Sequence, residues 1–309
     1  VIKKEDREIL VEMYGTEYEQ GEICERGYAF FSRAWKEMEF HCVKLEEVCR
    51  QKDAEFLGIL NDIKYGRNLQ NVIAYLESNQ SSDLMEEAPY LVGTNAKADK
   101  INQAHMRALD EKTEKKFWAI IEGDVTYEDI KNISFAKQSL VVNVGAKVML
   151  TANDANGEYV NGTMGTIIDI SKERGDATCI QVLTDKGKKV DVYRYEREIE
   201  RQDIEESKEK NKNGETVIVK KIVRKIVGSF KQFPIKIAWA MSIHKSQGQT
   251  FGQVNIDPRC WDSGQFYVAV SRAEAVAGIH FMAPIMKQYI RTLSDEVIKI
   301  LRESLYSII

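Results

Sequence analysis

The stretch that decides the fold is Phe233-Pro-Ile-Lys-Ile-Ala-Trp-Ala-Met-Ser-Ile-His-Lys-Ser-Gln-Gly-Gln-Thr-Phe251. An apolar run over 235–241, typical of a buried strand, ends here in a cluster of polar side chains and a glycine. In open α/β sheets, ligands bind beyond the carboxyl ends of the strands, and the next helical turn offers unpaired N–H groups to anions. A hydroxyl, an imidazole, an ammonium and a glycine that permits close backbone approach together suit a phosphodiester. An ordinary polar loop is the alternative interpretation.

A second segment lies further along the chain and reads Ser263-Gly-Gln-Phe-Tyr-Val-Ala-Val-Ser-Arg272. Its apolar spacing predicts a helix over 263–273, on which Gln265 and Arg272 share one face because they are seven residues apart. An arginine at the end of an apolar helix either forms a structural ion pair, here with Glu274, or presents its guanidinium to phosphate. The residue types leave both roles open.

Two earlier segments carry polar groups at predicted strand ends. Arg50 precedes a helix that Asp53 can cap and Gly66 can close. Thr94 and Asn95 end a short apolar strand over 89–94 and begin the helix that follows. A hydroxyl and an amide in this position either cap the helix or hydrogen-bond a nucleic-acid backbone.

The middle of the chain lacks the alternation of predicted strands and helices that is found on either side of it. Gly, Asn and Asp turns separate predicted short strands over 146–150, 164–170, 178–183, 188–193 and 216–223. Five short strands suggest a small antiparallel barrel. The charged run 196–213 is predicted to be a mobile loop or an exposed helix.

The simplest architecture is therefore an α/β parallel-sheet domain with a small β-barrel inserted into it. The predicted boundaries are a lead-in over 1–25, an α/β domain from 26–150 and 234–309, and an inserted barrel over 151–233.

Composition narrows the class of protein. The 309 residues are 43% hydrophobic and 30% charged, as in globular proteins, and neither a signal peptide nor a membrane-spanning run is visible. Five cysteines without a CxxC pair suit a reducing compartment, which predicts a cytoplasmic protein without a membrane partner. A net charge of −4 excludes a uniformly basic nucleic-acid binder. The segment 208–236, however, holds nine Lys/Arg against two Asp/Glu, which indicates either a polyanion footprint or a solvated hairpin face.

Several motifs are absent from the sequence. It contains no G-x-x-x-x-G-K-[ST] phosphate loop and no G-x-G-x-x-G, and no apolar strand ends in Asp-Glu that could hold Mg²⁺. The four histidines are scattered without zinc-ligand spacing, so no metal site is predicted. The chain has basic groups placed for phosphate but no nucleotide cradle of its own.

Together the segments resemble the C-terminal half of superfamily 1 DNA helicases, in the 5′-to-3′ branch that contains RecD, the phage helicase Dda and the petite-integration-frequency helicases. The stretch 238–251 resembles that family's motif V, the stretch 265–272 its motif VI, and Arg50-Gln51 its motif IV arginine. The segments 144–154 and 160–165 resemble the entry into the family's Src-homology-3-like (SH3-like) insertion. The resemblance implies a RecA-like domain, which is a P-loop NTPase fold without its own P-loop, carrying an inserted SH3-like antiparallel barrel.

The resemblance also implies residue roles. Arg272 and Arg50 are similar to arginines that reach the γ-phosphate of ATP, with Gln265 helping to orient it. Around the nucleotide the resemblance places Gly248 and Gln249, together with both arginines. The residues implied to bind a single DNA strand are Thr94, Asn95, Ser242, His244, Lys245, Ser246, Thr250 and Asn161.

The Walker A and Walker B motifs of the family lie in its first RecA-like domain and are absent from this sequence. We therefore expect half of a two-domain motor, completed by an N-terminal RecA-like domain of the same protein or of a partner chain, which holds most of the ATP and Mg²⁺ contacts. The expected partner is single-stranded DNA, and this chain alone is expected to be inactive. The alternatives are a non-catalytic single-stranded nucleic-acid-binding module and an interaction scaffold that uses the small barrel.

Overall fold

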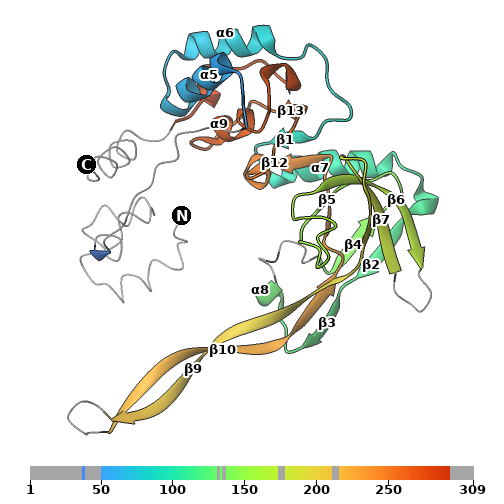
Figure 1. Cartoon of the computed structure of the whole chain (residues 1–309), viewed down its shortest axis with the longest axis vertical. Helices are drawn as coiled ribbons and strands as arrows, with labels where there is room; N and C mark the ends of the chain where they lie inside the picture. The colour runs from blue at the N-terminus through green and yellow to red at the C-terminus, as the bar shows by residue number, and fades with distance from the viewer. Residues whose placement is uncertain are drawn as a thin grey trace. The chain divides into compact units, whose positions relative to one another are not determined.

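The computed structural model describes residues 37–38, 50–130, 133, 137–172, 178–210 and 216–292, with the backbone alone at 172, 178, 202–210 and 216–222 (Figure 1). The predicted lead-in over 1–25 and the predicted helix over 294–305 lie outside these residues. Among the helices of the described part, none has the length and apolar composition needed to cross a membrane.

A four-stranded parallel sheet has the strand order β12-β1-β13-β14. Its strands are β1 (Tyr90–Val92), β12 (Ala240–Ser242), β13 (Val254–Ile256) and β14 (Ile279–Phe281). Every strand pair in it is parallel, although β1 lies about 150 positions before β12. This sheet confirms the predicted α/β class.

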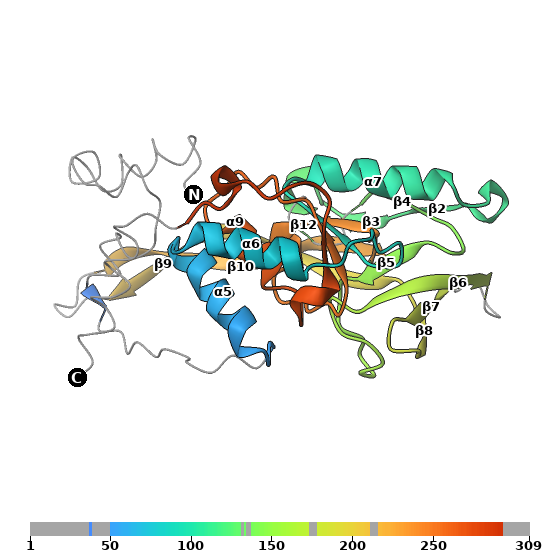
Figure 2. The same cartoon turned by 90° about the horizontal axis from the view of Figure 1, so that it is seen from above.

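Both faces of the parallel sheet are covered, as Figures 1 and 2 show. Alternate residues of β1 point to opposite faces. Leu91 packs into the main core with α5, α6 and α9, whereas Tyr90 and Val92 pack with α7. These helices are α5 (Ala54–Tyr65), α6 (Leu69–Asn79), α7 (Asn95–Arg107) and α9 (Gln265–Val270).

Helix α5 begins and ends where local sequence signals place it. The Asp53 carboxylate accepts hydrogen bonds from the backbone N–H groups of Glu55 and Phe56, at 2.8 and 3.2 Å. Gly66 closes the helix at φ +68°, in the left-handed region that favours glycine. Both predicted helix ends are confirmed.

A five-stranded antiparallel sheet has the order β11-β5-β6-β7-β8. Its strands are β5 (Lys147–Leu150), β6 (Met164–Lys172), β7 (Thr178–Thr184), β8 (Lys189–Val192) and β11 (Ile235–Ile237). A separate apolar core, including Val148, Ile180 and Phe233, fills one side of it. The predicted strands over 146–193 are thus present, while closure into an SH3-like barrel stays a prediction.

The predicted single strand over 235–241 is wrong. Ile235–Ile237 pairs with β5 in the antiparallel sheet, and Ala240–Ser242 pairs with β1 in the parallel sheet. Trp239 lies between the two strands, buried and stacked on His105 with ring centroids 5.2 Å apart. An apolar run shows no period that would reveal a change of sheet. Because β5 and β11 lie outside 151–233, the antiparallel sheet extends past both predicted boundaries of the insertion, and the domain division itself stays a prediction.

The remaining described elements outside the long hairpin and the loop after β12 are short. They are β2 (Lys115–Trp118), β3 (Ile120–Gly123), β4 (Ser139–Val142), α8 (Tyr127–Ile130), and the 3₁₀ turns η2 (Glu111–Thr113), η4 (Val276–Gly278) and η5 (Lys287–Tyr289). Strand β2 pairs with β4, and β3 pairs with the long hairpin described next.

Strands β9 (Tyr195–Lys210) and β10 (Thr216–Gln232) form one long antiparallel hairpin, drawn as a ribbon in Figure 1. The predicted loop or exposed helix over 196–213 is therefore wrong. The acidic β9 segment acquires its strand conformation by pairing with the basic β10 segment, which a local window does not include. Where side chains are described, the charges pair across the ribbon, as in Arg224–Glu200 at 3.8 Å and Lys231–Glu196 at 3.5 Å. These contacts favour the solvated hairpin face over a polyanion footprint.

The base of this hairpin is anchored by Arg201. Its guanidinium donates to the Asp129 carboxylate at 2.9 and 2.6 Å and to Asp124 at 2.7 and 2.6 Å. These hydrogen bonds hold the pKa of Asp129 well below its usual value, Arg201 contributing most and Thr126 next. Bidentate arginine–carboxylate pairs have fixed geometry, so this cluster sets the direction in which the ribbon leaves β3.

Candidate nucleotide and nucleic-acid interface

Beyond the carboxyl end of β12 the chain makes the 3₁₀ turn η3 (Ile243–Ser246) and then a loop through Gly248. Gly248 has φ +85°, which an L side chain rarely adopts. Ser246 is fully buried, and its hydroxyl donates to the Ile243 carbonyl at 2.7 Å. The described contact of the Ser246 side chain is thus within the turn, and the DNA contact that the resemblance implies for it stays a prediction. His244 and Lys245 remain exposed.

Asn102 of α7 fixes the position of β12 at the edge of the sheet. Its buried side chain accepts from the Ala240 N–H and donates to the Ala240 carbonyl, both at 2.8 Å. An amide side chain thereby takes the place of a neighbouring strand. Since β12 leads directly into Ser242, this contact sets where the polar cluster begins.

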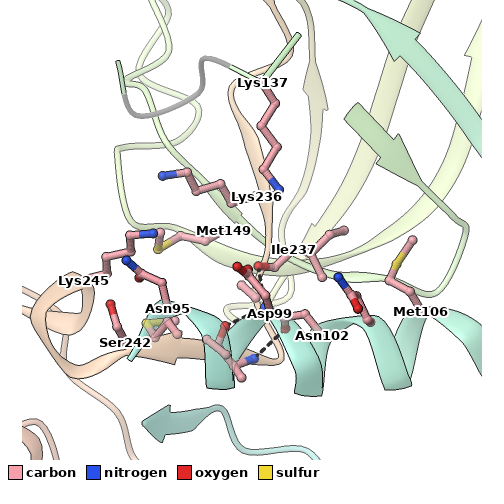
Figure 3. Close-up of a pocket in the computed structure, with 15 residues that line it drawn as sticks. Asn95, Asp99, Asn102, Met106, Lys137, Met149, Lys236, Ile237, Ser242 and Lys245 are labelled. Carbon is pink, nitrogen blue, oxygen red and sulfur yellow. Dashed lines mark hydrogen bonds between the residues drawn. The ribbon is translucent and has the colours of Figure 1, made fainter. Parts of the chain in front are cut away.

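Figure 3 shows a pocket of about 350 Å³ between α7, β12 and the antiparallel sheet. The pocket is lined by three of the residues that the resemblance implies bind single-stranded DNA, namely Asn95, Ser242 and Lys245. Lys137 and Lys236 line the same pocket from the antiparallel side. The structure therefore places three of these residues around one pocket, together with two further lysines.

The three lysines of the pocket lie close enough to influence one another. Burial, and after it the positive charges of Lys245 and Lys137, together lower the pKa of Lys236 to about 8. Asp99 is the carboxylate among the residues that line this pocket. Three ammonium groups around one hollow favour an anionic occupant, because an anion between them relieves their mutual repulsion.

We expect the affinity for single-stranded DNA to fall as pH rises through about 8. A bound phosphate stabilises the Lys236 ammonium, so the pKa of Lys236 is higher in the complex than in the free protein, and binding takes up a proton above pH 8. The association constant should then decrease by up to about tenfold per pH unit. Fluorescence anisotropy of a labelled oligonucleotide between pH 7 and 9.5 measures this decrease.

The matched variant for this prediction is Lys236→Arg, which keeps the charge over the whole range because a guanidinium does not titrate there. It should bind with little dependence on pH. A wild-type affinity that is flat from pH 7 to 9.5 would contradict the assignment of Lys236.

Arg50 and Arg272 both donate hydrogen bonds to Ser271. Arg50 donates from Nη1 to the Ser271 carbonyl at 2.8 Å and from Nε to the Thr250 hydroxyl at 2.8 Å. Arg272 donates from Nη2 to the Ser271 hydroxyl at 2.9 Å and from Nε to the Val268 carbonyl at 3.0 Å. Two arginines that are far apart in the sequence thus share one surface, and Thr250 belongs to it.

Neither of these guanidinium groups is neutralised by a carboxylate within the described part of the chain, where their partners are neutral oxygens. The structural ion pair of Arg272 with Glu274 is accordingly absent there. Burial lowers the pKa of Arg272, and the Arg50 charge adds to the effect. Their juxtaposition is therefore unfavourable until an anion approaches, which is what a phosphate site requires.

The pair is held in place by Gln51, which the sequence analysis named only as part of the Arg50-Gln51 motif. Its side chain is buried, and Nε2 donates to the Ser271 carbonyl at 3.0 Å and to the Ala273 carbonyl at 2.9 Å. These two bonds tie the segment before α5 to the turn after α9, and so place Arg50 beside Arg272.

Gln265 does not join the arginine pair in the described structure. Its buried amide donates to the Gly93 carbonyl and accepts from the Trp261 N–H, each at 3.1 Å. Helix α9 ends at Val270, so Arg272 lies in the following turn and not on the same helical face as predicted. The described contacts of Gln265 are with the end of β1 and with Trp261, and the orienting role that the resemblance implies stays a prediction.

Gln249 connects the arginine pair to the antiparallel module. Its backbone carbonyl accepts a long hydrogen bond of 3.5 Å from Arg272 Nη1. Its side-chain amide lies against Gly162, whose φ of +92° falls in the region that favours glycine. The neighbouring Asn161 is exposed and is fixed through its backbone N–H, which donates to the Asn153 side chain at 2.8 Å.

The other residues that the resemblance assigns to single-stranded DNA are at least partly exposed. Thr94 is the N-cap of α7, since its hydroxyl accepts from the Lys97 N–H at 3.3 Å, and Asn95 is exposed beside it. His244 Nε2 lies 3.7 Å from the Asp262 carboxylate, with both side chains about half exposed. Lys236 ends the basic segment 208–236 noted in the sequence, whereas Lys137 carried no sequence signal beyond its charge. Only the packing of the two sheets places both lysines beside Lys245.

The described residues contain no group of three or more His, Cys, Asp or Glu side chains suited to a metal ion. Two unneutralised guanidinium groups do fit the terminal phosphate of ATP. The Mg²⁺ that accompanies ATP stays a prediction.

Among known proteins, no family model matches this chain. Over 261 residues it is 30% identical to the "ATP-dependent DNA helicase Pif1" of Bdellovibrio bacteriovorus, a match that covers 84% of this chain and 54% of that protein. A protein of the same name from Campylobacter jejuni is 29% identical over 258 residues, with 80% and 54% covered. The chain spans about half the length of the curated relatives it matches.

The solved structures that resemble this chain are also Pif1 helicases. Bacteroides sp Pif1 in complex with ADP-AlF4 is similar with a TM-score of 0.71 and 27% identity, over 99% of this chain and 64% of that one. A Bacteroides Pif1 helicase in complex with ADP-AlF3 and ssDNA has a TM-score of 0.67 and 26% identity, over 100% and 64%. Together with the parallel sheet, these neighbours fit an α/β RecA-like fold.

Proposed function

We propose that this chain is the C-terminal motor half of an ATP-dependent 5′-to-3′ DNA helicase. The support is that the homologues of this chain are Pif1 helicases and that the chain matches their C-terminal part. ATP is held mainly by another RecA-like domain, of the same protein or of a partner chain. This half supplies arginine fingers to that ATP and a track for single-stranded DNA.

The observation that carries the proposal is the convergence of Arg50 and Arg272 on Ser271. Two guanidinium groups that donate to one residue, with no carboxylate partner in the described part of the chain, favour this function over a purely non-catalytic binding module. A nucleotide pocket completed from across a domain cleft needs such a pair.

ATP, when bound, supplies the phosphoryl group that is transferred to water. The chain's own contribution is electrostatic, because Arg50 and Arg272 have further N–H groups available for the equatorial oxygens of that phosphoryl group. Gln51 keeps the two side chains at fixed positions, so little reorganisation is needed during the reaction.

The strand track consists of the lysine pocket in Figure 3 and the exposed loop after β12. Lys137, Lys236 and Lys245 neutralise backbone phosphates, while Asn95 and Ser242 offer neutral hydrogen-bonding groups. Opening and closing of the cleft between the two halves would move this track relative to the other domain, which is a gating motion. Gln249 connects the two functions, since it contacts both Arg272 and the Gly162 loop.

The test compares strand binding with ATP turnover. The chain alone should bind a labelled oligothymidylate with an affinity that falls with salt, at a slope of about −0.7 per phosphate neutralised. It should show no ATP turnover with that oligonucleotide present, whereas the chain joined to its ATP-binding domain should turn ATP over. Robust turnover by the chain alone would contradict the division of labour, and salt-independent or absent binding would contradict the strand track.

A further inference from the structure

Trp261 is an exposed aromatic residue at the edge of the parallel sheet where the strand track lies. Its side chain is 55% exposed, although indole is among the groups that proteins most readily bury. The indole is therefore accessible at the edge of the sheet beyond which ligands bind in open α/β folds.

The indole has a fixed position. Its Cδ1–Nε1 edge lies against Gly93, where a Cβ atom would be 3.6 Å from both atoms. The backbone N–H of Trp261 donates to the side-chain oxygen of the buried Gln265, and the side-chain nitrogen of Gln265 donates to the Gly93 carbonyl. Arg291 donates to the Trp261 carbonyl at 2.8 Å. Three contacts thus hold the residue while its ring stays in solvent.

The neighbourhood suits a polyanion with exposed bases. Gly93 is followed directly by Thr94 and Asn95, and Asn95 lines the lysine pocket. The Cα atoms of Gly93 and Asn95 are at most about 7 Å apart, because the two residues are two positions apart along the chain. Lys97 and Arg259, each about half exposed, share the single buried carboxylate of Asp257.

We propose that Trp261 is a stacking platform for one unpaired base of the strand whose phosphates contact the lysine pocket. Gln265 is the positioning residue that fixes this platform against the end of β1. Stacking on an aromatic ring tolerates every base, so the contact gives affinity without sequence preference. This inference rests on the proposed strand track and adds a base contact to it.

The test measures oligothymidylate binding by the full chain and by single variants, using anisotropy and the quenching of intrinsic tryptophan fluorescence. Trp261→Ala should weaken binding by about 5- to 150-fold, as expected for one base–aromatic stack. Its salt slope should equal that of the wild type, because stacking neutralises no phosphate. Trp261→Phe should recover most of the affinity.

Trp118→Ala is the matched control, since Trp118 is 62% exposed but lies on β2, outside the parallel sheet. It should bind the strand as the wild type does and should keep the DNA-induced quenching, which Trp261→Ala should lose. If the wild type binds and Trp261→Ala binds equally well, the stacking platform is refuted while the proposed function stands. If the wild type does not bind single-stranded DNA, the strand track itself is refuted, and the stacking platform with it.

Discussion

Replacement of Arg272 by alanine is expected to lower ATP turnover by about 10³- to 10⁵-fold in the chain joined to its ATP-binding domain. The guanidinium would contribute charge that acts on the transferring phosphoryl group in a site with little competing solvent. Because Arg272 contacts Ser271 and Val268 and does not line the lysine pocket, single-stranded DNA binding should change little. Steady-state turnover and oligonucleotide anisotropy on the same preparation separate the two effects.

Arg67→Ala is the control for this prediction. Arg67 carries the same charge but stacks over the ring of Tyr65 at the exposed end of α5, at 5.0 Å. It should leave turnover unchanged. Turnover near the wild-type rate in Arg272→Ala would show that the arginine pair is not a finger, and would remove the main support for the proposed function.

The second large effect is expected when Lys137, Lys236 and Lys245 are all replaced by alanine. The logarithm of the DNA-binding constant falls with the logarithm of the salt concentration by about 0.7 for each phosphate neutralised. If each of the three lysines neutralises one phosphate, this slope should become shallower by about 2 in the variant. The concentrations 1 M and 50 mM differ by ~1.3 decades. If the two proteins bind equally at 1 M salt, this difference in slope lowers the affinity of the variant at 50 mM by about 10²- to 10³-fold. Binding isotherms at several salt concentrations give both quantities.

A charge-matched control removes Lys112, Lys189 and Lys287, which are exposed and lie outside the pocket. Because this variant has the same net charge as the pocket variant, it measures the contribution of overall charge alone. Equal losses of affinity and slope in the two variants would refute the lysine pocket as the strand's phosphate site.

Local sequence signals were enough for some parts of this protein. The ends of α5 follow from Asp53 and Gly66, whose capping contacts involve only residues within a few positions. The short strands of the antiparallel sheet follow from their turn residues for the same reason. The motif resemblance was also readable from the sequence, because each motif is one continuous stretch at a strand end.

The hairpin of β9 and β10 shows where local signals stop. The β9 segment is so highly charged that its sequence suggests a loop or exposed helix, and only its pairing with β10 makes it a strand. Likewise, the apolar run before His244 divides between two sheets, and no period within it marks the change.

The chemical character of this protein was set by its sequence alone, since residue types such as guanidinium, ammonium and hydroxyl groups at strand ends already indicate phosphate. Which of those groups meet was decided only by the tertiary structure. Arg50 reaches Ser271 across 221 positions, and Lys236 joins Lys245 because neighbouring strands enter different sheets. Hydrogen-bonding caps act over a few residues of chain, whereas charges act through space. A binding site made of like charges therefore becomes visible only when the chain is folded.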